Sequence, residues 1–503
     1  MVKAAERLST VRTYQHFINR QWVEGGSHIP RQSPANGELV ANFAKGTGDD
    51  ALQAVSAARS AFDTGPWPRF TALERSRRLL HLGGLIRRDA EELARMEAEE
   101  TGKPIRQARG DVKGAAELTE YAGALAQQLH GEVHTGLGDK RTAMLVREPV
   151  GVVGMIIPWN FPALIYAQKV PFALAAGCTT VVKPSEFTSS TALHMAQLAM
   201  EADIPDGVIN VVTGYGNEVG QAIVDSPGVD RISFTGSTAT GRRIMASASG
   251  TLKRLSLELG GKSANIVFAD ADLEDAVDGT LFGIYMNQGE CCCSGTRLLI
   301  EESIADAFIE RLVSAARRLR VGNPLDDSTD MGALIHPAHM HKVLSYIESG
   351  QQEGAKLVTG GHRLSGEEFD SGCFVAPTIL DQVQPSMRVF QEEIFGPVLV
   401  IRRFRTVGDA IEMANNTSYG LANALWTKDL DKAMVVSREL KSGTVWVNTM
   451  IDGSPQLPFG GYGGSGFGRE MGLVGLEEFT EVKTILIHLG KRDPYFASVV
   501  QQG

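Results

Sequence analysis

The sequence predicts an α/β fold with parallel sheets, and two observations support this prediction. From residue 150 onward, short apolar segments that end in Pro or Gly alternate with segments of helical periodicity. Strands that alternate with helices form parallel sheets. The chain has 503 residues, of which 43% are hydrophobic, so two or three domains are expected rather than one core.

The region before residue 125 predicts a short hairpin followed by helices. Residues 17–23 are typical of two short strands around a turn. Apolar residues recur at helical spacing over 51–62, and residues 73–100 continue in the same style. Gly102 and Pro104 follow directly, and such residues end helices.

Four buried strands are predicted next, with a helix over 190–202 between the second and the third. Their segments are 151–158, 178–184, 207–214 and 229–236. Ligands bind at the carboxyl ends of strands in such sheets. The segments that follow these strands are therefore the candidate binding segments.

Later parts of the chain repeat the α/β pattern and add two alternating segments. The second α/β pattern covers about residues 260–460. Apolar and polar residues alternate over 142–148 and 482–489, which predicts strands that pair at a domain or subunit edge.

Composition excludes several classes of partner and location. The net charge of −10 disfavours nucleic acid and anionic membrane surfaces. Apolar runs are far too short to span a membrane, and the first residues lack the apolar core of a signal peptide. Five cysteines, three of them adjacent, make a poor disulfide framework, so a cytoplasmic location with reduced thiols is expected.

The turn after the fourth strand, residues 234–241, leads into a helix. Free backbone N–H groups at such a turn suit a phosphate. Only Gly236 and Gly241 of a full glycine-rich motif are present, and an ordinary strand-to-helix turn explains the segment equally well.

Lys183 and Glu186 follow the second strand. A lysine there can hydrogen-bond ribose hydroxyls. A carboxylate accepts from an adenosine ribose 2′-OH and repels a 2′-phosphate, which favours NAD over NADP. For the two residues in isolation, the alternative is a solvated pair on a loop.

Glu258 lies between Leu257 and Leu259, just before two glycines. Apolar surroundings would raise the pKa of its carboxyl, which suits a general base or acid. The alternative is an exposed position on a strand, because Glu258 alternates with leucines. The following G-K-S is not the end of a nucleotide-binding P-loop, since Ser256 stands where that motif needs glycine.

Three of the five cysteines are consecutive: Cys291, Cys292 and Cys293. Adjacent side chains project in different directions, and no C-x-x-C or nearby histidine supplies further ligands, so no metal site is predicted. Flanking Gly289 and Gly295 favour a loop with close backbone approach. One exposed thiolate nucleophile is the hypothesis, with Cys292 mildly preferred by spacing, and buried structural cysteines are the alternative.

Taken together, seven segments resemble the NAD(P)-dependent aldehyde dehydrogenase superfamily, in the family's order and over nearly the whole chain. They are P-W-N-F-P (158–162), K-P-S-E (183–186), F-T-G-S-T (234–238), L-E-L-G-G-K (257–262), N-Q-G-E-C-C-C (287–293), E-E-I-F-G-P-V (392–398) and P-F-G-G-Y-G-G-S-G-F-G-R-E (458–470). The resemblance implies the hydrolytic, non-acylating branch. It also implies a Rossmann-type parallel-sheet cofactor domain, an α/β catalytic domain and a small β oligomerisation arm.

The domain boundaries that the resemblance implies follow the pattern changes along the chain. Residues 1–128 and 150–260 would form the NAD-binding domain, and residues 261–465 the catalytic domain. Residues 129–149 and 480–503 would form the oligomerisation arm and tail of a homodimer or homotetramer.

The resemblance assigns four catalytic roles. The family pattern of Gly, then Gln or Glu, then any residue, then Cys makes Cys292 the nucleophile. Glu258 falls on the general base, Asn160 on the oxyanion donor and Glu470 on a proposed proton relay.

The cofactor implied is NAD, with NADP as the alternative. Among the residues implied to contact the cofactor, Lys183 and Glu186 would bind the adenosine ribose, and Ser237 would bind the pyrophosphate. Glu393 and Phe395 would hold the nicotinamide ribose and ring. The remaining implied contacts are Ile156, Pro158, Trp159, Ser185, Gly216, Phe234, Thr235, Gly236, Leu259 and Gly260.

The implied reaction oxidises an aldehyde to the carboxylic acid through a cysteine thiohemiacetal and a thioester. Glu258 would activate water to hydrolyse the thioester. Branches that hand the acyl group to coenzyme A generally lack this acid, so a coenzyme A-acylating enzyme is the less favoured alternative. A structural or binding protein on the same fold is the other alternative.

The substrate is predicted only as a class of aldehyde. The resemblance implies an entrance lined by the helix after Asn160 and by residues 449–457, with candidate substrate contacts Phe161, Gln168, Met286, Asp452 and Phe459. Non-aromatic Gln168 and Met286 weaken an aromatic cage for quaternary ammonium. Because Asp452 could attract a cationic end, betaine-type and amino-aldehydes stay open beside medium-chain aliphatic aldehydes.

Overall fold

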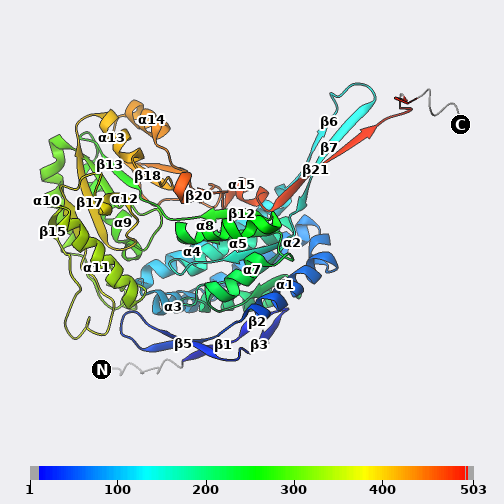
Figure 1. Ribbon diagram of the computed structural model, residues 1–503, viewed down its shortest axis with the longest axis horizontal. Helices are drawn as coiled ribbons and strands as arrows, with labels where there is room; N and C mark the ends of the chain where they lie inside the picture. The colour runs from blue at the N-terminus through cyan, green and yellow to red at the C-terminus, as the bar shows by residue number, and fades with distance from the viewer. Residues whose placement is uncertain (1–10, 493, 497–503) are drawn as a thin grey trace.

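The computed structural model describes residues 11–492 and 494–496. Residues 1–10 of the predicted NAD-binding domain and residues 493 and 497–503 of the predicted tail lie outside the described residues. Within the described part the strands form two large sheets and two three-stranded sheets. Figure 1 shows the large sheets, each flanked by helices, and a β arm that projects away from them.

The first large sheet has eight strands in the order β20-β12-β11-β8-β9-β10-β2-β3. Its five middle strands run parallel, as the alternation of apolar and helical segments predicts. The β2–β3 hairpin extends one edge and β20 the other, both antiparallel. The strands are β2 (His16–Ile18), β3 (Gln21–Val23), β8 (Val152–Ile156), β9 (Thr179–Lys183), β10 (Ile209–Val211), β11 (Arg231–Thr235), β12 (Arg254–Glu258) and β20 (Gly466–Phe467).

Helices from the first half of the chain, joined by α15 from near its end, pack on this sheet and on one another. The capping-box residues Thr47 and Thr71 begin the first two helices, and Gly102, with a φ of 84°, ends the third where the sequence predicts a stop. The helices are α1 (Gly48–Asp63), α2 (Ala72–Arg88), α3 (Ala90–Thr101), α4 (Ile105–Leu125), α5 (Pro162–Ala176), α6 (Ser190–Glu201), α7 (Gln221–Asp225), α8 (Thr238–Ala248) and α15 (Gly472–Glu477).

The second large sheet confirms the second α/β pattern. Its order is β15-β16-β17-β14-β13-β18-β19, and all strands except β15 run parallel. The strands are β13 (Ala264–Val267), β14 (Arg297–Glu301), β15 (Lys356–Thr359), β16 (Thr378–Asp381), β17 (Val398–Phe404), β18 (Ala422–Trp426) and β19 (Thr444–Val447). The helices are α9 (Leu273–Tyr285), α10 (Ala305–Ala316), α11 (Pro337–Gln352), α12 (Arg388–Gln391), α13 (Val407–Asn415) and α14 (Leu430–Glu439).

The projecting arm is a three-stranded sheet of β6 (Glu132–His134), β7 (Arg141–Pro149) and β21 (Thr480–His488). The two alternating segments of the sequence pair with each other here, antiparallel, from Thr480 opposite Pro149 to His488 opposite Arg141. A second small sheet, of β1 (Arg12–Tyr14), β4 (His28–Gln32) and β5 (Leu39–Ala44), lies near the N-terminal end (Figure 1).

A five-residue connection, residues 259–263, joins the two large sheets. It runs from the end of β12 at Glu258 to the start of β13 at Ala264. A Cβ added at Gly261 would overlap the backbone carbonyl oxygen of Cys292, so only glycine allows the cysteine loop to approach this closely. The fold thereby brings the carboxyl end of one sheet next to the cysteines.

Candidate active site

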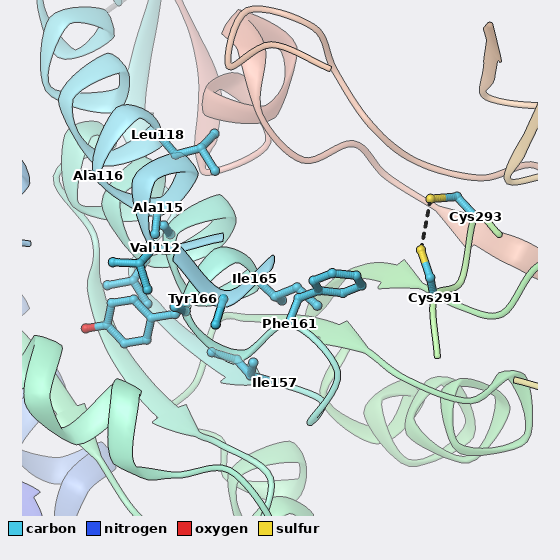
Figure 2. Close-up of a cluster of buried hydrophobic side chains, with 14 of the residues drawn as sticks. Val112, Ala115, Ala116, Leu118, Ile157, Phe161, Ile165, Tyr166, Cys291 and Cys293 are labelled. Carbon is cyan, nitrogen blue, oxygen red and sulfur yellow. Dashed lines mark hydrogen bonds between the residues drawn. The ribbon is translucent and has the colours of Figure 1, made fainter. Parts of the chain in front are cut away.

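The three cysteines lie in a loop between α9 and β14. Cys291 and Cys293 are buried, whereas Cys292 is partly exposed. The Sγ atoms of Cys291 and Cys293 lie 3.4 Å apart, and Figure 2 shows them pointing toward each other, with the Phe161 ring nearby. The segment turns here, since the Ser294 N–H donates to the Cys291 carbonyl at 3.2 Å.

Exposure, more than acidity, distinguishes Cys292 from Cys291 and Cys293. Hydrogen bonds from Cys292 and Cys293 hold the pKa of Cys291 well below its usual range, and the contact with Cys291 raises the pKa of Cys292. The three thiols therefore share protons as one cluster. Within that cluster, only Cys292 is open to a reagent.

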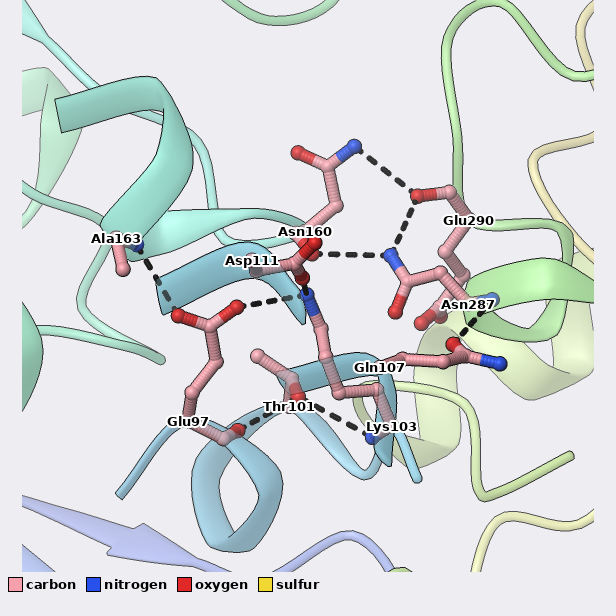
Figure 3. Close-up of polar contacts among 9 residues, drawn as sticks. All are labelled: Glu97, Thr101, Lys103, Gln107, Asp111, Asn160, Ala163, Asn287 and Glu290. Carbon is pink, nitrogen blue, oxygen red and sulfur yellow. Dashed lines mark hydrogen bonds and ion pairs between the residues drawn. The ribbon is translucent and has the colours of Figure 1, made fainter. Parts of the chain in front are cut away.

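Asn160 is buried beside this loop, at the end of the segment that follows β8. Its Nδ2 donates to the carbonyl oxygen of Glu290 at 3.0 Å. Asn287 fixes the same region, since its Nδ2 donates to the carbonyls of Asn160 and Glu290 (Figure 3). A side-chain amide has two N–H donors, and the bond to Glu290 uses one of the two on Asn160.

Glu258 is buried at the end of β12, so the alternative of an exposed strand position is wrong. Neither carboxyl oxygen has a hydrogen-bond partner. Burial raises the pKa of its carboxyl well above the usual range, and the nearby charge of Glu470 adds to the effect. A Cβ added at Gly460 would lie 2.8 Å from Oε1, so this glycine makes room for the carboxyl group.

Glu470 lies close by in a different environment. Its Oε1 accepts from Lys169 Nζ at 2.7 Å and from Ser233 Oγ at 3.0 Å. The sequence reasoning missed Lys169, although a lone lysine inside the apolar run of residues 162–176 is a visible signal for a buried cation. Phe459 and Glu470 pair through reciprocal backbone hydrogen bonds of 2.8 Å.

The residues expected at the adenosine ribose lie together after β9. Lys183 is buried, and its Nζ lies 3.3 Å from Glu186 Oε2, whose side chain is partly exposed. The pair leaves further donors on the amine and acceptors on the carboxylate, so it fits a ribose diol. Ser185 is buried in the same turn, where its Oγ accepts from the Phe187 N–H.

The glycine turn after β11 forms the start of α8. Ser237 is the N-cap, and its side chain accepts from the Thr240 N–H at 3.2 Å. The helix N-terminus so formed fits a pyrophosphate. Among the remaining predicted cofactor contacts on this sheet, Phe234 and Leu259 are buried, and Ile156 and Thr235 are partly buried. The three predicted glycines lie in the connections: Gly236 follows Thr235, Gly260 follows Leu259, and Gly216 begins the turn after β10.

The predicted nicotinamide residues lie between the two sheets. Glu393 Oε1 accepts from the backbone N–H of Gly261 at 2.9 Å. The rings of Trp159 and Phe395 meet edge to face, with centroids 5.4 Å apart. Pro158 directly precedes Trp159 at the end of the first sheet. The residues of this region therefore fit a dinucleotide that runs from Lys183 toward Cys292.

The predicted substrate residues are distributed over several elements. Phe161 is the residue before α5 rather than part of it, and its ring faces Lys103 Nζ at 4.3 Å. Gln168 and Met286 are partly buried. Asp452 lines a cavity of about 460 Å³ whose walls include Trp426, Phe282, Asp275 and Asp278.

Among the described residues, no group of three or more His, Cys, Asp or Glu side chains is arranged to hold a metal ion. No helix of the described chain is long and apolar enough to cross a membrane.

Comparison with known proteins identifies the family of this chain. The model of the aldehyde dehydrogenase family matches residues 22–485. Betaine aldehyde dehydrogenase of Bacillus subtilis (strain 168) is 44% identical over 93% of this chain and 96% of that protein. Human mitochondrial aldehyde dehydrogenase is 44% identical over 98% of this chain and 95% of its own.

Solved structures are equally similar. An NAD-dependent aldehyde dehydrogenase from Sinorhizobium meliloti matches with a TM-score of 0.95 and 46% identity, over 98% of this chain and 97% of that one. Betaine aldehyde dehydrogenase from Staphylococcus aureus in complex with NAD⁺ matches with a TM-score of 0.94 and 38% identity, over 96% of both chains. Agreement in sequence and fold over nearly the whole chain shows that it belongs to the aldehyde dehydrogenase family.

Proposed function

We propose that this chain oxidises an aldehyde to the carboxylic acid with NAD⁺, with Cys292 as the nucleophile and Glu258 as the base that activates water. One observation carries the assignment. Both carboxyl oxygens of Glu258 are buried without a hydrogen-bond partner, within electrostatic range of Cys292. An unpartnered buried acid weakens the fold, and a catalytic base is the role that accounts for it.

The first step is attack of the Cys292 thiolate on the aldehyde carbon, which forms a thiohemiacetal. The oxyanion that develops accepts hydrogen bonds from the second N–H of the Asn160 amide and from the backbone N–H of Cys292. Because Asn160 is held through Glu290 and Asn287, its amide is oriented before the substrate arrives.

When bound, NAD⁺ supplies a hydride acceptor for the thiohemiacetal carbon. Lys183 and Glu186 hold its adenosine ribose, and the N-terminus of α8 at Ser237 binds its pyrophosphate. Glu393 and Phe395 hold the nicotinamide ribose and ring. The Glu186 carboxylate repels a 2′-phosphate, so NAD is preferred over NADP.

The last step is hydrolysis of the Cys292 thioester. Glu258 takes a proton from water, whose oxygen attacks the acyl carbon. The Glu470 carboxylate, held by Lys169, lies within electrostatic range of Glu258 and can pass the proton onward. A base of this kind supports release of a free acid rather than transfer to coenzyme A.

We propose an aldehyde with a positive charge, of the betaine or amino-aldehyde class, as the substrate. Three carboxylates and two aromatic rings line the cavity beside residues 448–452, and both kinds of group attract cations. Cys292, Glu258 and Asn160 are not among its lining residues, so this cavity would act where the aldehyde enters. A relative of 44% identity bears the name betaine aldehyde dehydrogenase. Uncharged aliphatic aldehydes are the competing class.

A substrate panel tests this assignment. NADH absorbance is followed with betaine aldehyde, 4-aminobutanal and hexanal, each with and without coenzyme A. The cationic aldehydes should exceed hexanal in kcat/KM by about 10-fold, the effect of roughly one charge pair, and Asp452→Asn should reduce only that preference. Equal values for all three would overturn the cationic class, and no NADH with any aldehyde would favour a non-enzymatic role.

We also propose that the arm joins copies of this chain into a homodimer or homotetramer in the cytoplasm. Among the described strands, β21 pairs with β7 on one edge only, and β19 is one of the two edge strands of the second sheet. Exposed apolar side chains on β21, among them Val482 and Leu486, form a surface whose burial in an interface would be favourable. A reducing cytoplasm would keep the five free thiols reduced, which is the state that Cys292 needs to act as a nucleophile.

Sedimentation equilibrium tests the arm. Leu486→Lys, at a side chain that is 60% exposed, should shift the protein toward smaller species. Leu430→Lys, at an apolar residue of α14 that is 75% exposed, should leave the mass unchanged. Identical masses for wild type and both variants would contradict assembly through β21.

A further inference from the structure

Phe395 has a backbone conformation that phenylalanine rarely adopts. Its φ is 63°, in the left-handed region that suits glycine. Such a conformation persists only where the surroundings hold it. The backbone carbonyl of Phe395 lies 2.6 Å from Nε2 of His339, which makes this hydrogen bond the nearest restraint on the residue.

His339 is well placed to give a single fixed hydrogen bond. It lies in the first turn of α11 and is 8% exposed. Burial lowers its pKa to about 4, so the imidazole is neutral near pH 7. A neutral ring has one N–H, and the carbonyl of Phe395 requires that the N–H be on Nε2.

The His339 ring also packs among the aromatic residues of the proposed nicotinamide site. Its centroid lies 5.6 Å from that of Trp159 and 6.1 Å from that of Phe395. Since Trp159 and Phe395 contact each other edge to face, the three rings form one cluster. Movement of any one ring would move the other two.

A second contact connects His339 with the cysteine loop. Nε2 lies 3.6 Å from Oε1 of Glu290, which is a packing contact rather than a hydrogen bond. That oxygen accepts from the backbone N–H of Ile335 at 2.9 Å. The carbonyl of Glu290, two residues before Cys292, accepts from Asn160.

We propose that His339 is a positioning residue, which fixes Phe395 relative to Glu290 and so aligns the cofactor ring with the nucleophile loop. The proposal rests on the function proposed above for Phe395. His339 acts through its N–H and its ring and touches no reacting atom. Loss of the donor should weaken cofactor binding and slow hydride transfer, because Phe395 is then free to leave its left-handed conformation.

The test compares three variants of the full-length protein. His339→Ala removes the donor, and His339→Gln keeps an N–H at a similar reach. His341→Gln changes an exposed histidine two residues along the same helix and is the matched control. Each is measured for thermal unfolding, for NADH binding by fluorescence, for single-turnover NADH formation and for alkylation of Cys292 by iodoacetamide.

His339→Ala should weaken NADH binding and slow single-turnover NADH formation, each by about 10-fold, the effect of one buried hydrogen bond. Its alkylation rate should stay within about two-fold of wild type, and His339→Gln should recover most of both losses. Unchanged NADH binding in the Ala variant would overturn the proposal, and so would an equal loss in the Gln variant. If wild type oxidised no aldehyde, the proposed function would fail, whereas NADH binding would still decide the role of His339.

Discussion

Two clusters of acids in the interior differ in how their charges are compensated. In the first, Lys103 Nζ lies 2.8 Å from Glu97 Oε1 and 2.6 Å from Asp111 Oδ2. The other oxygen of Glu97 accepts from the Ala163 N–H at 3.2 Å. Figure 3 shows the lysine between its two carboxylates.

The second cluster contains Glu258 and Glu470. Here Lys169 and Ser233 bind Oε1 of Glu470, but nothing binds either oxygen of Glu258. Burial therefore raises the pKa of the Glu258 carboxyl with no hydrogen bond to oppose it. Glu97 and Lys103 of the first cluster are as buried as Glu258 and Glu470, so burial alone does not separate the two clusters.

The difference indicates which acids support the fold and which perform chemistry. A buried ion pair with all partners present is a structural unit whose disruption leaves an uncompensated charge. A buried acid without partners weakens the fold, and active sites commonly contain such groups. Mutation of each cluster should then affect different properties of the protein.

The largest expected effect is on Glu258. Glu258→Gln should lower steady-state turnover by about 10²–10⁴-fold, the range for loss of a general base, because the thioester is no longer hydrolysed. The first turnover should still release NADH as a burst. Stopped-flow absorbance separates the burst from the steady state.

Stability provides the control for that variant. Because Glu258 has no hydrogen bonds to lose, Glu258→Gln should unfold in denaturant at the same concentration as wild type or at a higher one. Unchanged steady-state turnover would exclude the deacylation role. A large loss of stability would show that Glu258 belongs with the structural acids.

Most of the fold is predictable from sequence because its signals are local. β8, β9, β10 and β11 each coincide with an apolar segment that ends in Pro or Gly, and the helix expected over 190–202 is α6. The pairing of β7 with β21 spans over 300 residues of chain. Alternation predicts each of these strands but not its partner, because pairing depends on the closed tertiary structure.

The site is predictable only in part, for the same physical reason. The resemblance of short segments marks Cys292, Glu258 and Asn160, and the structure brings all three to the junction of the two sheets. Lys169 and His339 act through contacts with residues far along the chain. The lone lysine in an apolar run marks Lys169 only as a buried cation, and no local pattern reports the partners of either residue, which emerge only from the folded geometry.

Lys103→Met tests the structural cluster and should have the next largest effect. The lysine is fully buried, so its removal leaves Glu97 and Asp111 without their cation. Breaking a buried pair in this way costs about 3–5 kcal/mol of unfolding free energy, which urea denaturation measures. Lys113→Met, at an exposed lysine of α4, is the control and should change stability by less than about 0.5 kcal/mol. A fully stable Lys103→Met would remove the distinction between the two clusters.

The smallest expected effect is a shift in the pH dependence of kcat, which tests whether neighbouring charges set the pKa of Glu258. The charge of Glu470 raises the pKa of Glu258, and the charge of Lys169 lowers it. Glu258 must lose its proton to act, so deacylation rises with pH through this pKa. Glu470→Gln removes a negative charge and frees the charge of Lys169, and both changes should move the rising limb of kcat to lower pH. Lys169→Met removes the positive charge and should move the limb to higher pH. The two variants break the same ion pair, so simple damage to the site would shift the rising limb of kcat in the same direction in both variants. Only shifts in opposite directions agree with electrostatic control of Glu258.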